Sequence, residues 1–207
     1  MSIGSLTCNH CTIGSLNSTG PLTLRHTNVK GNTSSIGAAE AQDCSLGAFN
    51  GTGSIDLKDS KIEGSFLNTG AAQLTNSQFK ETTIIGKLIA TSANCQSIHQ
   101  TGHAELLSCT AKTGMFTGSL TAKKCSIEDL KVTAKTIRLT DCSVKSLVVR
   151  KQNPSKKTTV HIGNSPDATR ETYIAKIMCE DPTTEIIYSA NTRKADEIVG
   201  TTHITYA

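Results

Sequence analysis

One spacing pattern recurs along most of this chain and restricts the folds that it can adopt. In the segment CSIEDLKVTAKTIRLTDCSVKSL, residues 125–147, Cys125 and Ile127 reappear 17 residues later as Cys142 and Val144. Self-similarity at a fixed period is the signature of repeat architectures, in which each repeat buries its apolar face only against its neighbours. The fold therefore depends on what kind of repeat unit this spacing builds.

The pattern registers nine times between Ser5 and about Arg150, in steps of 16 or 17 residues. If each repeat is numbered so that Leu6 holds position 2, its inward side chains fall at positions 2, 4, 7, 9 and 12. The columns at positions 2 and 4 are apolar in a chain that is only 36% hydrophobic, which chance does not explain. Position 2 holds Leu6, Leu22, Ala39, Ile55, Ala72, Leu88, Ala104, Leu120 and Ile137, and position 4 holds Cys8, Leu24, Ala41, Leu57, Leu74, Ala90, Leu106, Ala122 and Leu139.

Two further inward columns complete each repeat. The column at position 9 runs Ile13, Val29, Leu46, Ile62, Phe79, Cys95, Ala111, Ile127 and Val144. The column at position 12 is looser and holds Leu16, Asn32, Phe49, Ser65 beside Phe66, Thr82, Ile98, Gly114 beside Met115, Leu130 and Leu147. Positions 2 and 4, like positions 7 and 9, are two apart, so each pair lies on one face of a short β-strand.

Glycines close many of the repeats. Gly permits the positive φ that a tight corner needs, and it marks the end of a repeat at Gly20, Gly37, Gly53, Gly70, Gly86, Gly102 and Gly118. Units of this length are too short for two helices, which excludes an α-helical solenoid. The sequence therefore predicts an all-β fold, a single-stranded parallel β-helix with about nine coils and about three short strands in each.

Stacking of coils explains why each column keeps its chemistry, because inward side chains lie about 4.8 Å from their equivalents in the next coil. Parallel strands joined by crossovers favour a right-handed helix. The triplets SIG and TIG near residues 2–4, 12–14 and 35–37 are typical of left-handed helices, but those are built from hexapeptides and the observed step does not fit them. A right-handed helix is the prediction.

Composition bounds the core and the partners. Aromatic residues make up 3% of the 207 residues and Trp is absent, so the core must be built from small aliphatic side chains. The net charge of +4 comes from basic residues spread along the chain, which does not indicate a nucleic-acid surface. No apolar stretch is long enough to span a membrane. No signal peptide is visible in this sequence. The alternative that a signal peptide was removed before residue 1 stays open.

Residues 151–207 leave the strict register, so the expected organisation is a β-helix repeat domain over 1–150 and longer coils or a β cap over 151–207. A solvated turn is expected at 151–157, and turn signals stand at Asp181-Pro182 and Asn164-Ser165-Pro166. Irregular segments on a rigid scaffold often carry function. Strand-like runs are expected at Thr158–Ile162, Thr172–Cys179, Thr184–Ser189 and Glu197–Tyr206.

Five of the eight cysteines share one column, position 7, which also contains Thr27, Ser60, Ser77 and Ala93. The column thus favours a small side chain at a tight inward corner, where Cys acts as a small hydrophobe. A disulfide within the column is the competing interpretation, but stacked parallel side chains rarely achieve the required dihedral angle. Free buried thiols lean towards a reducing, cytoplasmic compartment, whereas a removed signal peptide would indicate export. These cysteines are Cys11, Cys44, Cys109, Cys125 and Cys142.

A metal or redox site is the sharper hypothesis for Cys8-Asn9-His10-Cys11, because C-x-x-C spacing can serve either purpose. The motif stands alone, without a second pair at ligand spacing. Cys8 and Cys11 also fall on inward positions and His10 on an outward one. Cys8 and Cys11 are therefore only weak metal candidates, and we expect neither a metal nor a cofactor.

Catalytic signals are weak. Glu128 and Asp129 form a carboxylate pair, but adjacent residues of a strand face opposite ways, and charges on a solvated face need no further cause. His99 and His103 lie near the end of one repeat and are expected to face solvent. No nucleophile elbow, P-loop or zinc-protease motif is present, so we expect no catalytic residue. Near the carboxylate pair stand Lys123, Lys124, Arg138 and Asp141.

The first coil raises the question of its open edge. Residues 1–6 run directly into the repeat, without an amphipathic helix or a polar plug. The edge strand of a β-helix pairs with other chains unless it is capped. Two alternatives stay open, a preceding segment that has been removed or a first coil that meets a partner.

The register of short, Gly-cornered coils with Val, Ile and Leu columns, from Ser5 to about Arg150, resembles that of the bactofilins. Those bacterial proteins have a small right-handed β-helix and polymerise end to end. The coils here are slightly shorter and the cysteine column is unusual. A looser similarity is to uncharacterised, exported bacterial β-helix proteins. The resemblance is architectural and transfers no site residue, but it implies a structural, self-assembling protein.

Three functions follow as expectations. The first is a non-enzymatic structural or scaffolding protein that self-associates through its coil ends or a flat face, so that its partner is a second copy of the chain. The alternative is an exported adhesin or glycan-binding module that meets a glycan or another cell-surface component. A carbohydrate-active enzyme is the third, because even, short coils leave little room for a cleft. No nucleic-acid partner and no transmembrane segment are expected.

Overall fold

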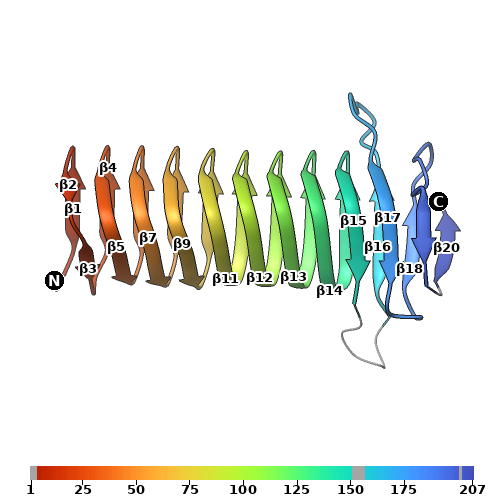
Figure 1. Ribbon diagram of the computed structural model, residues 1–207, viewed down its shortest axis with the longest axis horizontal. Helices are drawn as coiled ribbons and strands as arrows, with labels where there is room; N and C mark the ends of the chain where they lie inside the picture. Colours follow the sequence, from red (N-terminus) through yellow and green to blue (C-terminus); the bar gives the residue numbers. More distant parts are fainter. Residues whose placement is uncertain (1–3, 151–156, 201) are drawn as a thin grey trace. The chain divides into compact units, whose positions relative to one another are not determined.

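The computed structural model describes residues 4–150, 157–200 and 202–207, and every described strand pairing is parallel. These residues contain no helix, and the strands stack coil on coil as a parallel β-solenoid (Figure 1). The predicted fold class is confirmed. The turn expected over residues 151–157 lies, up to residue 156, outside the described residues. The handedness of the helix stays a prediction.

Two compact units divide the chain, residues 1–101 and 102–207, with the division inside β12 (Asn94–Leu107). In the first unit the opening coil has three separate strands, and the later coils join the second and third strands into one long strand. Before β12 the strands are β1 (Leu6–Asn9), β2 (Thr12–Ile13), β3 (Leu16–Ser18), β4 (Leu22–Arg25), β5 (Asn28–Ile36), β6 (Ala39–Gln42), β7 (Ser45–Thr52), β8 (Ile55–Lys58), β9 (Lys61–Thr69), β10 (Ala72–Thr75) and β11 (Gln78–Thr91).

The second unit begins with long strands and continues with shorter ones after residue 150. Its long strands run through the glycine corner, and the left-handed corners at Ser108, Lys124 and Asp141 separate each strand from the next. After β12 the strands are β13 (Thr110–Lys123), β14 (Ser126–Thr140), β15 (Ser143–Val149), β16 (Thr159–Gly163), β17 (Tyr173–Cys179), β18 (Glu185–Tyr188), β19 (Glu197–Val199) and β20 (His203–Tyr206).

The register of the strands reproduces the columns read from the sequence. In the first unit Leu6 pairs with Leu22, and each position-2 residue pairs with the next as far as Leu88. In the second unit Leu120 pairs with Ile137, and the column then continues through Val160, Ile186 and Ile204. The coils after residue 150 therefore keep the same inward column, although their spacing in the sequence is irregular.

One assignment at position 12 is wrong by one residue. Thr33, not Asn32, pairs with Phe49 and is buried, and of the two residues named for the fourth coil, Ser65 and Phe66, it is Phe66 that continues the column. The cause is a register shift between Val29 and Asn32, where a bend between two faces holds an extra residue.

The sequence pattern missed a further inward column, two residues after position 12. In the first unit most of its side chains are small or polar, including Ser35 and Asn68, which are 1% exposed, and Ile84 is the apolar exception. The Asn68 amide donates to the carbonyls of Gly53 and Ala71 at 3.2 Å and so satisfies the backbone of a glycine corner. In the second unit the same column is apolar, with Phe116, Val132, Val149 and Cys179.

Each coil turns at two kinds of corner. The glycine corner was predicted: a Cβ at Gly53, whose φ is +126°, would lie 2.5 Å from the Gly37 carbonyl oxygen. The second corner, at position 6, was not predicted, because its left-handed residues are not glycine. Their φ angles lie between 46° and 56° in His10, His26, Asp43, Asp59, Asn76, Ser92, Ser108, Lys124 and Asp141.

Strands after residue 157 match the expected runs closely, except that the last run is two strands, β19 and β20. Between them Gly200, at φ +102°, makes a corner over the Cys179 carbonyl. Both turn signals are confirmed, by the hydrogen bonds from the Thr184 amide to the Asp181 carbonyl and from the Ala168 amide to the Ser165 carbonyl.

Candidate functional site

The cysteine column at position 7 is a hydrogen-bonding corner. Each thiol or hydroxyl donates across the left-handed residue to the carbonyl two positions earlier, as in Cys44 to Gln42 at 3.1 Å and Ser60 to Lys58 at 2.7 Å. The Ser60 hydroxyl also accepts the Cys44 amide at 3.1 Å, which links adjacent coils. The column therefore selects small donors as well as small volume, a requirement that the interpretation of Cys as a hydrophobe missed.

The thiols of this column are free, and their pKa values shift in different directions: a hydrogen bond with Cys125 lowers the pKa of Cys142. All eight cysteines are free, so the disulfide alternative finds no support. Hydrogen bonding to Cys109 and Cys142, together with burial, raises the pKa of the Cys125 thiol far above its usual value. Burial likewise raises the pKa of Cys44. Protonated, buried thiols are poor nucleophiles and poor metal ligands.

Cys8 and Cys11 lie close together at the edge of the first coil, both half-buried. Burial, a hydrogen bond to Cys11 and its nearby charge raise the pKa of Cys8, which opposes the thiolate that a metal needs. His10 is exposed at the left-handed corner and stacks on His26, with ring centroids 4.7 Å apart. Within the described residues no group of three or more His, Cys, Asp or Glu side chains could hold a metal ion.

Glu128 and Asp129 were expected to face opposite ways. Both side chains are instead exposed, because β14 bends at this point. Arg138 is also exposed. Asp141 differs from them because it is buried at a left-handed corner, where its carboxylate accepts the Ser165 amide at 2.8 Å and the Ser165 hydroxyl. Burial tends to raise the pKa of Asp141, but the Ser165 hydrogen bonds and the charges of Lys123 and Lys124 lower it overall.

His99 is exposed, whereas His103 takes part in a polar cluster. Its Nδ1 lies 2.6 Å from the Ser119 hydroxyl of the next coil, and its Nε2 lies 2.8 Å from Glu105. The register of β13 and β14 shifts between Gly118 and Ser119, where β14 holds one extra residue and Gly118 has a φ of +128°. A serine, an imidazole and a carboxylate can relay a proton, but catalysis also needs a concave site with oxyanion donors. The contact between His103 and Ser119 links two adjacent coils.

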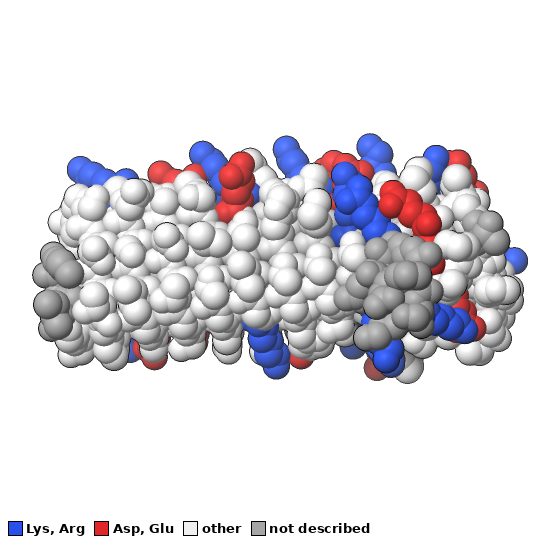
Figure 2. Space-filling view, turned by 90° about the horizontal axis from the view of Figure 1, so that it is seen from below, with Lys and Arg blue, Asp and Glu red and all other residues white. Residues whose placement is uncertain are grey.

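Charge is distributed unevenly around the first unit. In each coil of this unit the third strand is the part that follows position 12. The outward residues of these third strands include no Lys, Arg, Asp or Glu, and we call this surface the uncharged face. In the view of Figure 2 a broad area over the coils of this unit likewise carries no charged side chain. The face comprises Asn17, Thr19, Ser34, Ile36, Asn50, Thr52, Leu67, Thr69, Thr83, Ile85, His99 and Thr101.

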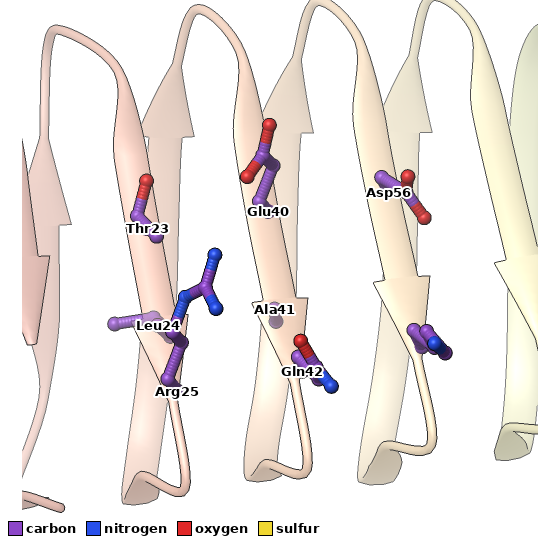
Figure 3. A pocket seen from close by; sticks show the side chains of 8 residues that line it. Thr23, Leu24, Arg25, Glu40, Ala41, Gln42 and Asp56 are labelled. Atoms are coloured by element: carbon purple, nitrogen blue, oxygen red, sulfur yellow. The ribbon is translucent and has the colours of Figure 1, made fainter. Parts of the chain in front are cut away.

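Hollows on the first unit are shallow. The hollow in Figure 3 has a volume of about 100 Å³ and lies across β4, β6 and β8, where Arg25, Glu40, Asp56 and Lys58 line it. A space of this size holds a few water molecules, since small-molecule sites typically need about 300 Å³ or more. The positive and negative side chains that line this hollow are therefore interpreted as ordinary residues of a solvated surface.

A larger hollow, of about 300 Å³, lies on the uncharged face across β5, β7 and β9. Ala48 contributes only a methyl group to its lining. Its lining contains no charged residue and consists of Asn32, Thr33, Ser34, Ala48, Phe49, Asn50, Ser65 and Leu67.

The described chain also presents an open strand edge in each unit. Because alternate residues of a parallel strand direct their backbone groups to opposite sides, and Leu6 and His10 donate to the next coil, Thr7 and Asn9 direct theirs to the open side of β1. Among the described residues β1 pairs only with β4.

At the other end of the chain, β20 pairs only with β18 among the described residues. The His203 amide donates to the Thr184 carbonyl just before β18 and the Ala207 amide to Tyr188, so Ile204 and Tyr206 direct their amides away from β18. Ile204 is 41% exposed and Tyr206 57%, although their columns are elsewhere buried. Tyr206 stacks on the buried Tyr188 with centroids 5.8 Å apart, and Lys194 lies 4.7 Å from its ring centroid. Apolar columns and unpaired backbone are thus exposed together.

Comparisons with protein-family models, with curated proteins and with solved structures find no match. Among the described residues, no helix is long and apolar enough to cross a membrane.

Proposed function

We propose that this protein is a non-enzymatic structural β-solenoid that self-associates by stacking coil on coil through its open strand edges. The observation that carries the proposal is the state of β20, where Ile204 and Tyr206 are the last described members of two core columns and, among the described residues, no strand pairs with their outward amides. A second coil placed there would bury both side chains and continue the ladder.

Physical chemistry favours such stacking over other uses of the edge. An exposed strand edge is a template for pairing, and proteins that avoid pairing place a charge or a proline on it. Ile204 and Tyr206 are neither. The resemblance to the bactofilins, read from the Gly-cornered coils, supports the same function.

Sedimentation velocity over a range of concentrations tests the proposal. Ile204→Lys places a charge at the end of an apolar column, where burial without a partner is costly, so the association should weaken by about tenfold or more. Thr205→Lys is the matched control, because it adds the same charge one residue away on an outward side chain of β20. A wild-type chain that stays monomeric at every concentration, or equal association of the two variants, would contradict the proposal.

A further inference from the structure

The uncharged face of the first unit has a composition that its strands alone do not require. Other outward columns of the same coils carry charges, such as Arg25 and Lys58 on one strand face. Charged residues make up 18% of the chain, so their absence from twelve outward positions in consecutive coils points to a role for this surface. A charge-free face does not attract charged polymers, because it has no group to pair with them.

The hollow on this face differs from the other hollows of the first unit. Three other hollows of this unit are lined by charged side chains, for example Lys61 and Glu63 in one and Lys87 in another. The hollow on the uncharged face is larger, at about 300 Å³, which reaches the size of typical ligand sites. An uncharged lining and a volume that reaches the size of a ligand site therefore occur in the same hollow.

Amide and hydroxyl groups form the rim of this hollow. Asn32, Ser34, Asn50 and Ser65 each can donate and accept hydrogen bonds without carrying charge. Sugar hydroxyls have the same dual capacity, so they can exchange hydrogen bonds with this rim without leaving a buried charge unpaired.

Apolar groups on the same face suit the C–H surfaces of a sugar ring. Leu67 borders the hollow and is 38% exposed, and Ile36 and Ile85 nearby are 56% and 49% exposed. One outward column of the face, Thr19, Ile36, Thr52, Thr69, Ile85 and Thr101, is β-branched throughout. Such side chains hold few rotamers, so binding costs them little conformational entropy.

We propose that the uncharged face of the first unit binds a neutral polysaccharide, with one sugar seated in the hollow between Asn32, Asn50 and Leu67. Coils lie about 4.8 Å apart, so a chain that runs along the stack meets a new set of outward side chains at each coil. The proposal is independent of end-to-end assembly, because the face lies on the side of the coils and the edges lie at their ends.

Co-sedimentation with insoluble cellulose, chitin and starch tests this inference, with soluble heparin as a charged competitor. Wild-type protein should bind at least one of the three neutral polymers, and heparin should not displace it. Asn50→Ala removes an amide from the rim and should weaken binding roughly two- to tenfold. Ala48→Phe fills the hollow and should abolish binding. Gln73→Ala is the matched control, because it removes an exposed amide from β10 on another face.

Each result of these measurements either supports the polysaccharide proposal or overturns it. Circular-dichroism melting first confirms that each variant is folded, and a folded Ala48→Phe that binds like the wild type overturns the site. Absence of wild-type binding to all three polymers, or binding that heparin displaces, also overturns it. If Ala48→Phe instead breaks up a dimer seen by sedimentation, the occupant is a second copy and the polysaccharide is wrong. The edge variant Ile204→Lys should keep wild-type binding, so failure of the assembly proposal would be recognised separately.

Discussion

At the scale of the residue, the left-handed corner explains the cysteines. The φ of position 6 brings the following side chain back over the carbonyl two residues earlier, so a hydroxyl or thiol at position 7 closes the corner with a hydrogen bond. Cys, Ser and Thr all satisfy this geometry, and Ala93 shows that one coil can do without it. The column is structural, and its chemistry is that of a turn.

Ser60→Ala should destabilise the protein by about 1–3 kcal/mol, because it removes the bond to the Lys58 carbonyl and leaves the buried Cys44 amide without its acceptor. Ser60→Cys restores both partners and should recover most of the loss. Urea unfolding of the two variants measures the difference. Equal stability of Ser60→Ala and the wild type would show that the corner bond is not needed.

The left-handed residue itself gives a second prediction. Ser92 has a φ of 54° and an exposed side chain. Ser92→Val should cost about 1–2 kcal/mol, because a β-branched residue is strained there, whereas Ser92→Gly should be tolerated. Thermal melting of both variants is the measurement. A Val variant as stable as the Gly variant would refute the conformation assigned to this corner.

At the scale of the element, the sequence predicted columns and strands better than corners. Inward positions 2, 4 and 9 could be read directly, since a strand with one buried face imposes period two on its side chains. Asn32 was assigned in place of Thr33, and Ser65 was not separated from Phe66, because a bend inserts a residue and shifts the phase. The inward column containing Asn68 was missed because most of its first-unit members are small or polar, so that Ile84 alone does not give a repeating apolar signal.

The clamp between Asp141 and Ser165 holds the segment that joins β16 to β17, and it makes stability depend on pH. The pKa of Asp141 is lower in the folded chain than the usual value of about 3.9, so folding favours the ionised carboxylate. Its contribution is therefore complete above about pH 4 and is lost as pH falls through the folded pKa.

Asp141→Asn should accordingly be less stable than the wild type at pH 7, and the gap should narrow as pH falls below about 4. Denaturant midpoints measured from neutral to acidic pH test this, with Asp129→Asn as a control at an exposed carboxylate. A gap that stays constant with pH would mean that ionisation of Asp141 does not contribute.

At the scale of the whole molecule, the sequence predicts the fold much better than it predicts the function. Nine repeats constrain the fold strongly, because every coil repeats the same evidence. Function has no such redundancy here: no further ligand joins Cys8 and Cys11 within the part of the chain that the structure describes, and the His103 cluster appears only when the outward residues of adjacent coils are brought together. The surfaces that support the proposals, an open edge and a charge-free face, consist of residues with no motif.

Hydrogen–deuterium exchange at low and high protein concentration tests the central claim most directly, because it reports on the backbone amides of the edge strands. The account predicts that amides of β20 and β1 exchange more slowly as concentration rises, whereas those of the interior strand β8 do not change. Assembly that leaves the exchange of β1 and β20 unchanged, or that slows exchange only on the uncharged face, would contradict it.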